Sequence, residues 1–237
     1  MTASASVGET LAGWNRQTVL IVLLSLSLDV VIVALALRVR NLFRNVQARK
    51  RELEVLAATD SLTGLDNRRI AMERAAIEWE RSRRCGGNLA CLLIDIDHFK
   101  IFNDRLGHRY GDLILQEFAS VLKKHTRKMD IVGCIGGEEF VVFLAGTSRP
   151  DAWAFAEKIR SKTAEVTTKL GPLHISIGIA DLGHEPESLN QLLDFADKAL
   201  YWAKEHGRNR TVSYEMVENP GAPPAGSDGS RITTSMS

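Results

Sequence analysis

The segment that most constrains the fold lies between residues 130 and 144. The stretches 130–135 and 140–144 are rich in Val, Ile, Phe and Leu, which predicts two short β-strands. The turn between them reads Gly136-Gly137-Glu138-Glu139, and glycine permits both positive φ and close approach of a ligand. An ordinary hairpin with solvated glutamates is an equal alternative for this segment alone. Two adjacent carboxylates also favour a cation, and oxygen ligands favour Mg²⁺.

A second acidic cluster strengthens the metal hypothesis. Residues 89–94 form a continuous apolar run, which predicts a buried central strand, and the run ends in Asp95-Ile96-Asp97. Carboxylates two residues apart on a strand point to the same side of the sheet. Acidic strand ends near acidic hairpins hold metal ions in phosphoryl- and nucleotidyl-transfer sites. Two such clusters in one domain therefore predict metal-assisted chemistry.

Composition limits the possible classes of protein. The chain has 237 residues, of which 45% are apolar and 25% charged, as in a folded globular protein. The net charge of +1 gives no overall attraction to nucleic acid, and we predict no nucleic-acid partner. Cys85, Cys91 and Cys134 are odd in number and show no CxxC spacing, so we predict reduced thiols rather than disulfides or a zinc site.

The N-terminal part predicts a membrane anchor. Residues 18–37 are mostly apolar, and a helix of that length rises roughly 30 Å, one hydrocarbon thickness. The basic residues follow the apolar run, which places residues 1–17 outside and the remainder in the cytoplasm. A cleaved signal peptide ending near Ala34-Leu35-Ala36 is the alternative, but the basic n-region is missing. We therefore expect a single-pass protein of the inner (cytoplasmic) membrane.

Composition and hydrophobic patterning also predict the boundaries of the three remaining segments of the chain. Residues 38–58 predict a basic juxtamembrane helix, which forms either a two-stranded coiled coil or a solvated monomeric helix. Residues 59–214 predict one α/β domain, with strands at 89–94, 130–135, 140–144, 174–180 and 211–214 and helices at 67–83, 112–125, 150–169 and 187–205. Residues 215–237 are rich in Pro and Gly, which predicts a disordered tail.

The order of these motifs resembles the GGDEF family of diguanylate cyclases. The matching stretches cover residues 59–214: Asp60-Ser61-Leu62-Thr63-Gly64-Leu65, Asn67-Arg68-Arg69, Asp95-Ile96-Asp97-His98-Phe99-Lys100, Asn103-Asp104, Gly107-His108, Gly111-Asp112, Gly136-Gly137-Glu138-Glu139-Phe140, Ala199-Leu200-Tyr201, Ala203-Lys204 and Gly207-Arg208-Asn209-Arg210. The GGEEF form of the signature is an active variant in that family. The resemblance implies a palm-like α+β fold, with a mostly antiparallel central sheet flanked by helices.

The resemblance also implies a reaction. Two GTP molecules would condense to cyclic di-GMP with release of two pyrophosphates, and each protomer of a homodimer would hold one GTP. Mg²⁺, or alternatively Mn²⁺, would neutralise the triphosphate and activate the attacking oxygen.

The resemblance implies a role for each residue that matches a functional position of the family. Asp95, the Ile96 carbonyl and Glu138 resemble the metal ligands, and Glu139 and Glu138 resemble the catalytic carboxylates. The substrate residues would be Asn103 and Asp112 for guanine, Phe99 and Lys100 in the phosphate loop, and Lys204 and Arg208 for the triphosphate.

A product-inhibition site is also implied. Arg127 and Asp130 match the family's RxxD motif, which binds cyclic di-GMP as an inhibitor. Cys134 stands where the family usually has Arg, and we expect this departure to weaken inhibitor binding.

Two alternatives to an active cyclase remain. A catalytically inactive relative would act as a receptor for GTP or cyclic di-GMP, although it would normally lack several of the acidic and basic site residues that are present here. A cyclase with another nucleotide product is the second alternative, and Asp112 favours GTP over it.

Overall fold

The computed structural model describes residues 21, 23–24, 26–28, 31–44 and 58–219 of a chain that divides into two units, Met1–Leu56 and Ala57–Ser237. The described residues of the first unit are helical, and their apolar side chains, such as those of Ile21 and Leu35, are exposed. Within these described stretches no helix is both long enough and apolar enough to cross a membrane. Parts of the predicted span and of the predicted juxtamembrane helix, together with residues 1–17, lie outside the described residues.

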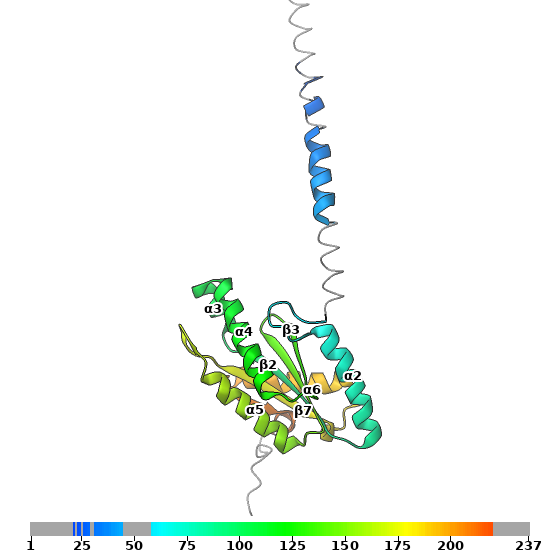
Figure 1. Cartoon of the computed structure of the whole chain (residues 1–237), viewed down its shortest axis with the longest axis vertical. Helices are drawn as coiled ribbons and strands as arrows, with labels where there is room; N and C mark the ends of the chain where they lie inside the picture. Colours follow the sequence, from blue (N-terminus) through cyan, green and yellow to red (C-terminus); the bar gives the residue numbers. More distant parts are fainter. Residues whose placement is uncertain (1–20, 22, 25, 29–30, 45–57, 220–237) are drawn as a thin grey trace, which may run out of the picture. The chain divides into compact units, whose positions relative to one another are not determined.

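A mixed sheet forms the centre of the second unit (Figure 1). Its strand order is β1-β3-β4-β2-β7-β8. The strands are β1 (Asp66–Asn67), β2 (Leu89–Ile96), β3 (Ile131–Gly136), β4 (Glu139–Ala145), β7 (Ile175–Asp181) and β8 (Thr211–Ser213). The central pairs β3–β4, β4–β2 and β2–β7 are antiparallel as expected, whereas the edge pairs β1–β3 and β7–β8 are parallel.

Helices cover both faces of this sheet. They are α2 (Arg68–Cys85), α3 (Phe99–Leu106), α4 (His108–His125), α5 (Arg149–Ala164), α6 (Leu189–Glu205) and α7 (Tyr214–Glu218). Alternate residues of β2 face opposite cores. Leu92 and Ile94 pack with the core that includes α4 and α5, and Cys91 and Leu93 with the core that includes α2 and α6. Burial on both faces explains why β2 reads as a continuous apolar run.

Local signals set most of the element boundaries. Asn67 caps α2 by accepting a hydrogen bond from the Ile70 N–H, and Ser148 caps α5 in the same way through Asp151. The predicted helices 67–83 and 187–205 and the predicted strand 89–94 are therefore confirmed within a few residues as α2, α6 and β2.

Four expectations about secondary structure were wrong in detail. Phe99 and Lys100, which were expected in a loop, begin α3, and α4 begins at His108 rather than at residue 112. The helix expected over 150–169 ends at Ala164, because the chain then turns into a small hairpin of β5 (Thr167–Thr168) and β6 (Gly171–Pro172). Residues 214–218 form α7 instead of the start of a disordered tail, because the Glu215 side chain pairs with Arg149 and Tyr214 is buried.

Candidate active site

The β3–β4 hairpin carries the acidic turn to the end of the central strand. Gly137 adopts φ 48°, which the turn requires and glycine allows at no steric cost. Glu139 is the register partner of Asp95 in the β2–β4 ladder. The Ile96 N–H donates to the Glu138 carbonyl oxygen at 3.3 Å. The two acidic clusters recognised in the sequence therefore lie side by side.

Lys204 completes this cluster from the last turn of α6. Its Nζ lies 2.7 Å from Oδ2 of Asp95, whose side chain is largely buried. Burial raises the pKa of Asp95 above its ordinary value, and the Lys204 ammonium opposes that rise. The nearby carboxylates of Glu138 and Glu139 raise the same pKa further. A site with this much negative charge around one buried carboxylate favours a cation.

The phosphate-loop residues sit at the start of α3. The side chain of Phe99 is buried in the core that includes α4 and α5. Lys100 is exposed on the first turn of α3. Because the first N–H groups of a helix have no intrahelical acceptors, this turn also presents donors suited to an anion.

Asn103 and Asp112 are brought together by the tight packing of α3 against α4. Gly111 lies in α4, and a Cβ placed on it would come within 2.0 Å of Asn103 Oδ1. The Asn103 carboxamide therefore rests on the Cα of Gly111, next to Asp112 in the chain. Asn103 is half-buried and Asp112 is exposed, so both polar ends are accessible to a ligand.

The loop after α6 carries Arg208. Arg208 and Asn209 both adopt left-handed conformations, with φ of 59° and 43°. The Arg208 side chain is exposed, and its N–H donates to the Ala203 carbonyl oxygen at 3.0 Å, which folds the loop back onto the helix. Lys204 and Arg208 thus belong to one compact helix end.

Asp97 does not join the carboxylate cluster. Its Oδ1 accepts from Ser176 Oγ at 2.7 Å, and its Oδ2 accepts from the Asn209 N–H at 2.9 Å. The second acidic residue of the strand-end motif is therefore committed to neighbouring protein groups, although its spacing from Asp95 suggested a shared role.

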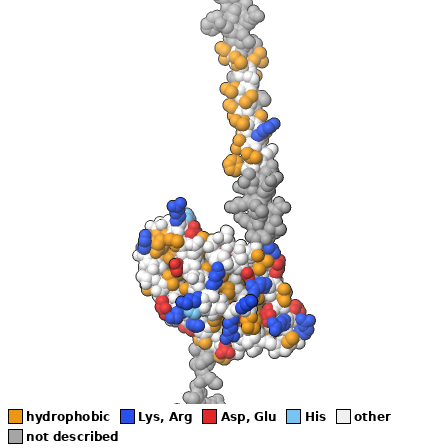
Figure 2. All heavy atoms as spheres, in the orientation of Figure 1, with side chains coloured by type: hydrophobic (Ala, Val, Ile, Leu, Met, Phe, Trp, Pro, Cys, Tyr) orange, Lys and Arg blue, Asp and Glu red, His pale blue; other side chains and the backbone are white. Residues whose placement is uncertain are grey.

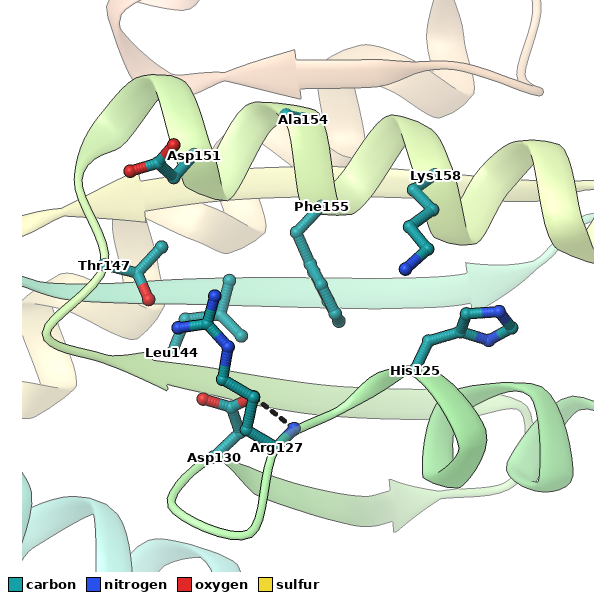
Figure 3. Close-up of a pocket in the computed structure, with 9 residues that line it drawn as sticks. All are labelled: His125, Arg127, Asp130, Leu144, Thr147, Asp151, Ala154, Phe155 and Lys158. Carbon is teal, nitrogen blue, oxygen red and sulfur yellow. Dashed lines mark hydrogen bonds between the residues drawn. The ribbon is translucent and has the colours of Figure 1, made fainter.

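A separate cavity contains the RxxD residues. It has a volume of about 280 Å³ and is lined by His125, Arg127, Asp130, Leu144, Thr147, Asp151, Ala154, Phe155 and Lys158. Figure 3 shows Arg127 from the loop after α4, and Phe155 and Lys158 from α5, directed into the same space. Figure 2 shows Lys and Arg side chains spread across the lower part of the second unit.

The Asp130 carboxylate faces this cavity with a free acceptor. Its Oδ2 accepts from the Arg127 N–H at 2.7 Å, whereas its buried Oδ1 has no hydrogen-bond partner among the residues that the structure describes. Burial raises the pKa of Asp130, and Arg127 opposes the rise. A buried acceptor without a donor costs about 1–3 kcal/mol, which a ligand with N–H groups would recover.

Some residues near these sites could not be predicted from sequence patterns. Lys158 and His125 carry no motif of their own and reach the cavity only through helix packing. Ser176 and Asn209 become partners of Asp97 although Asn209 lies 112 residues away in the chain. Cys134 is half-buried in β3, where burial raises the pKa of its thiol and favours the neutral form. A thiol cannot supply the positive charge of the Arg that is usual at this position.

The mixed sheet with helices on both faces carries an acidic hairpin beside an acidic strand end, which is the arrangement that the sequence predicted for a nucleotidyl-transfer domain. The family model described as "Diguanylate cyclase, GGDEF domain" matches residues 57–210. The chain belongs to the GGDEF family of diguanylate cyclase domains.

Curated relatives agree with this assignment. Diguanylate cyclase A of Treponema denticola is 44% identical over 128 residues, which cover 52% of this chain and 34% of the relative. The response regulator PleD of Caulobacter vibrioides is 40% identical over 163 residues, which cover 66% of this chain and 36% of the relative. The match thus spans about a third of the length of each relative.

Solved structures share the fold. The GGDEF domain of DgcB from Caulobacter crescentus, in complex with c-di-GMP, matches with a TM-score of 0.64 and 32% identity. The match covers 67% of this chain and 96% of the DgcB chain. The active GGEEF domain of a diguanylate cyclase from Vibrio cholerae matches with a TM-score of 0.59 and 32% identity. The match covers 63% of this chain and 97% of the Vibrio cholerae chain.

Proposed function

We propose that this protein is a diguanylate cyclase that condenses two GTP molecules into cyclic di-GMP and two pyrophosphates. The observation that carries the proposal is the pairing of β2 with β4, which sets Asp95 opposite Glu139 and Ile96 against Glu138. Lys204 already brings one positive charge to this carboxylate cluster.

The metal part of the proposal rests on the donor set. Asp95, Glu138 and the Ile96 carbonyl would hold Mg²⁺, with Mn²⁺ as the alternative. Among the residues that the structure describes, no three His, Cys, Asp or Glu side chains are grouped as a metal site. Mg²⁺ is usually bound by one or two carboxylates together with substrate phosphates and water, and Asp95 and Glu138 would supply those carboxylates. When bound, the ion would neutralise the triphosphate and lower the pKa of the attacking hydroxyl.

The protein groups around it suit GTP. Asp112 would accept from the guanine N1–H and N2–H₂, a donor pair that adenine lacks, and Asn103 would add a second polar contact. The exposed Lys100, the first turn of α3, and Lys204 and Arg208 would bind the triphosphate. Lys204 would move from Asp95 towards phosphate as the substrate enters.

The bond changes follow from this placement. The 3′-oxygen of one GTP forms a bond to the α-phosphorus of the other, and the bond from that phosphorus to the bridging oxygen breaks as pyrophosphate leaves. The exposed Glu139 carboxylate accepts the proton of the 3′-hydroxyl, since Glu138 is assigned to the ion. Each protomer holds one GTP, so a homodimer would supply both reactants in the right orientation.

The direct test incubates the full chain with GTP and Mg²⁺, and with ATP in parallel, and identifies the products by mass. We expect cyclic di-GMP from GTP alone, and no product from Asp95→Ala or Glu139→Ala although both remain folded. Glu165→Ala, an exposed carboxylate paired with Lys162, is the matched control and should be fully active. Normal turnover by either site variant would overturn the assignment. A folded wild type that binds GTP or cyclic di-GMP without turnover would favour the receptor alternative.

We further propose that the Arg127–Asp130 cavity binds cyclic di-GMP as an inhibitor. Arg127 and Lys158 would contact its phosphates, and the unpartnered Asp130 Oδ1 would accept from guanine N–H groups. The DgcB domain, which has the same fold, was solved in complex with c-di-GMP. Arg127→Ala and Lys158→Ala should each raise the product concentration needed for half-inhibition about tenfold. Lys162→Ala, one turn further along α5, is the control, and inhibition curves identical for all four proteins would exclude the cavity.

Dimerisation and membrane anchoring complete the proposal. If two protomers share the reaction, activity per protomer should fall at low protein concentration, and a constant activity would contradict the shared site.

The anchor over residues 18–37 and the location in the inner membrane rest on the apolar run in the sequence. Fractionation of cells expressing the full chain should place it with the membranes, and deletion of residues 1–40 should release it.

A further inference from the structure

Asp97 is a buried carboxylate that the proposed reaction does not use. It is only 4% exposed, and both of its oxygens are engaged, one by Ser176 Oγ and the other by the Asn209 N–H. Its own N–H donates to the His174 carbonyl oxygen at 3.0 Å. Each oxygen of Asp97 thus accepts a hydrogen bond from a protein donor, which compensates its burial and gives the side chain a role apart from the carboxylate cluster.

The segment that Asp97 holds is conformationally costly. Arg208 and Asn209 are consecutive non-glycine residues at positive φ, and each such residue costs of order 1 kcal/mol or more unless its surroundings fix it. Two contacts fix Asn209: its N–H binds Asp97, and its Oδ1 accepts from Arg160 Nη1 at 3.1 Å. Without the Asp97 contact the N–H would lose its acceptor and the loop would relax.

We propose that Asp97 is a positioning residue that sets the direction of Arg208 towards the triphosphate. Asp97 follows β2 directly, two residues after Asp95, so the bond from Asp97 to Asn209 fixes the loop that carries Arg208 relative to the metal carboxylates. The inference rests on the proposed function, because Arg208 must bind phosphate for its position to matter. In this proposal Asp97, the second carboxylate of the strand-end motif, orients Arg208, which binds the triphosphate together with Lys204.

The test compares Asp97→Ala, Arg208→Ala and the double variant in the full chain, with initial rates measured over a range of GTP concentrations. We expect each single variant to raise KM for GTP about tenfold, with kcat changed less than threefold, because each loses the same charge-assisted contact. The double variant should match Arg208→Ala. If Asp97→Ala does not fold, Asp97→Glu takes its place, since it keeps the charge but displaces the carboxylate by one methylene.

Two controls separate positioning from other roles. Asp97→Asn keeps an oxygen for the Asn209 N–H and offers an amide N–H to Ser176, so KM should stay within threefold of wild type. The Mg²⁺ concentration for half-maximal activity should be unchanged in it, whereas a metal ligand would lose affinity on this change. Ser176→Ala removes the other contact of the same carboxylate, and should lower the denaturation midpoint without raising KM.

The outcomes distinguish the inference from the function on which it rests. If Arg208→Ala leaves KM unchanged, the triphosphate role of Arg208 fails. If Arg208→Ala raises KM and the Asp97 variant does not, or if the two effects multiply in the double variant, the positioning role is wrong. A KM that rises in Ser176→Ala as far as in Asp97→Ala would reduce the role of Asp97 to general stability.

Discussion

Replacement of Gly111 by Ala tests whether the carboxamide of Asn103 is held where it can read a base. Gly111 lies within α4 and does not have positive φ, so its backbone conformation would accept any residue. A Cβ there would lie 2.0 Å from Asn103 Oδ1, 3.0 Å from its Cγ and 3.1 Å from Phe99 Cζ. The closest of these atoms belong to the end of a side chain that can rotate away.

Two opposing effects determine how much Gly111→Ala changes the free energy of unfolding. Ala in a helix interior is favoured over Gly by about 1 kcal/mol, and the small adjustment of the Phe99 ring offsets part of that gain. The free energy of unfolding should therefore stay within about 1 kcal/mol of wild type. The displaced Asn103 side chain would lose its proposed contact with guanine. Such a contact is worth about 1–1.5 kcal/mol, which corresponds to roughly a tenfold rise in KM for GTP.

The assay measures KM for GTP by product formation and stability by urea denaturation, for Gly111→Ala, Asn103→Ala and the double variant. Gly87→Ala is the matched control, because a Cβ there meets only ordinary contacts, the nearest at 3.7 Å. The double variant should resemble Asn103→Ala. An unchanged KM in Gly111→Ala, or a further rise when it is added to Asn103→Ala, would refute the reasoning, as would an unfolded Gly111→Ala protein.

Three further results are expected. Gly178→Ala should unfold the protein or cost at least about 3 kcal/mol in urea denaturation, because its Cβ would lie 2.1 and 2.2 Å from backbone atoms of α6, which cannot rotate away; a mild effect would contradict this packing. Burial raises the folded-state pKa of Asp95, so the folded protein holds more protons than the unfolded one between the two pKa values, and stability falls as pH rises through that window. Asp95→Asn should therefore be more stable than wild type at pH 7, and urea midpoints measured at falling pH should show the gain shrink towards pH 4; a gain independent of pH would exclude this cause. Arg149→Ala removes the guanidinium from the buried Asp181 carboxylate, which keeps the Gly183 N–H as a donor, and should cost roughly 2–3 kcal/mol, whereas loss of the more exposed Glu215 should cost under about 1 kcal/mol; equal costs would show that burial does not decide the difference.

Local patterns were enough to predict most of the elements and to locate both acidic clusters at strand ends. The apolar run of β2, the glycines of the hairpin turn and the caps of α2 and α5 act over a few residues, so neighbouring residues are sufficient to recognise them. The acidic turn and the acidic strand end could likewise be recognised in the sequence without knowing how they meet, and their binding of a metal ion stays a prediction.

Short or weakly periodic segments were not recognised. The eight residues of α3 and the five of α7 are too short for a reliable helical period, and α7 depends on contacts with distant residues. The β5–β6 hairpin has only two residues in each strand, so it carries no alternating pattern that would separate it from the helix before it.

The arrangement of the site depended on long-range packing. The register that sets Asp95 opposite Glu139, the approach of Lys204 from α6 and the entry of Lys158 into the Arg127 cavity all join elements far apart in the chain. Asp97 gives the clearest contrast, because its spacing from Asp95 suggested a shared metal site while its oxygens bind Ser176 and Asn209. Residue types fix which chemistry is available, but the direction of a buried carboxylate is set by the donors that the whole fold places around it.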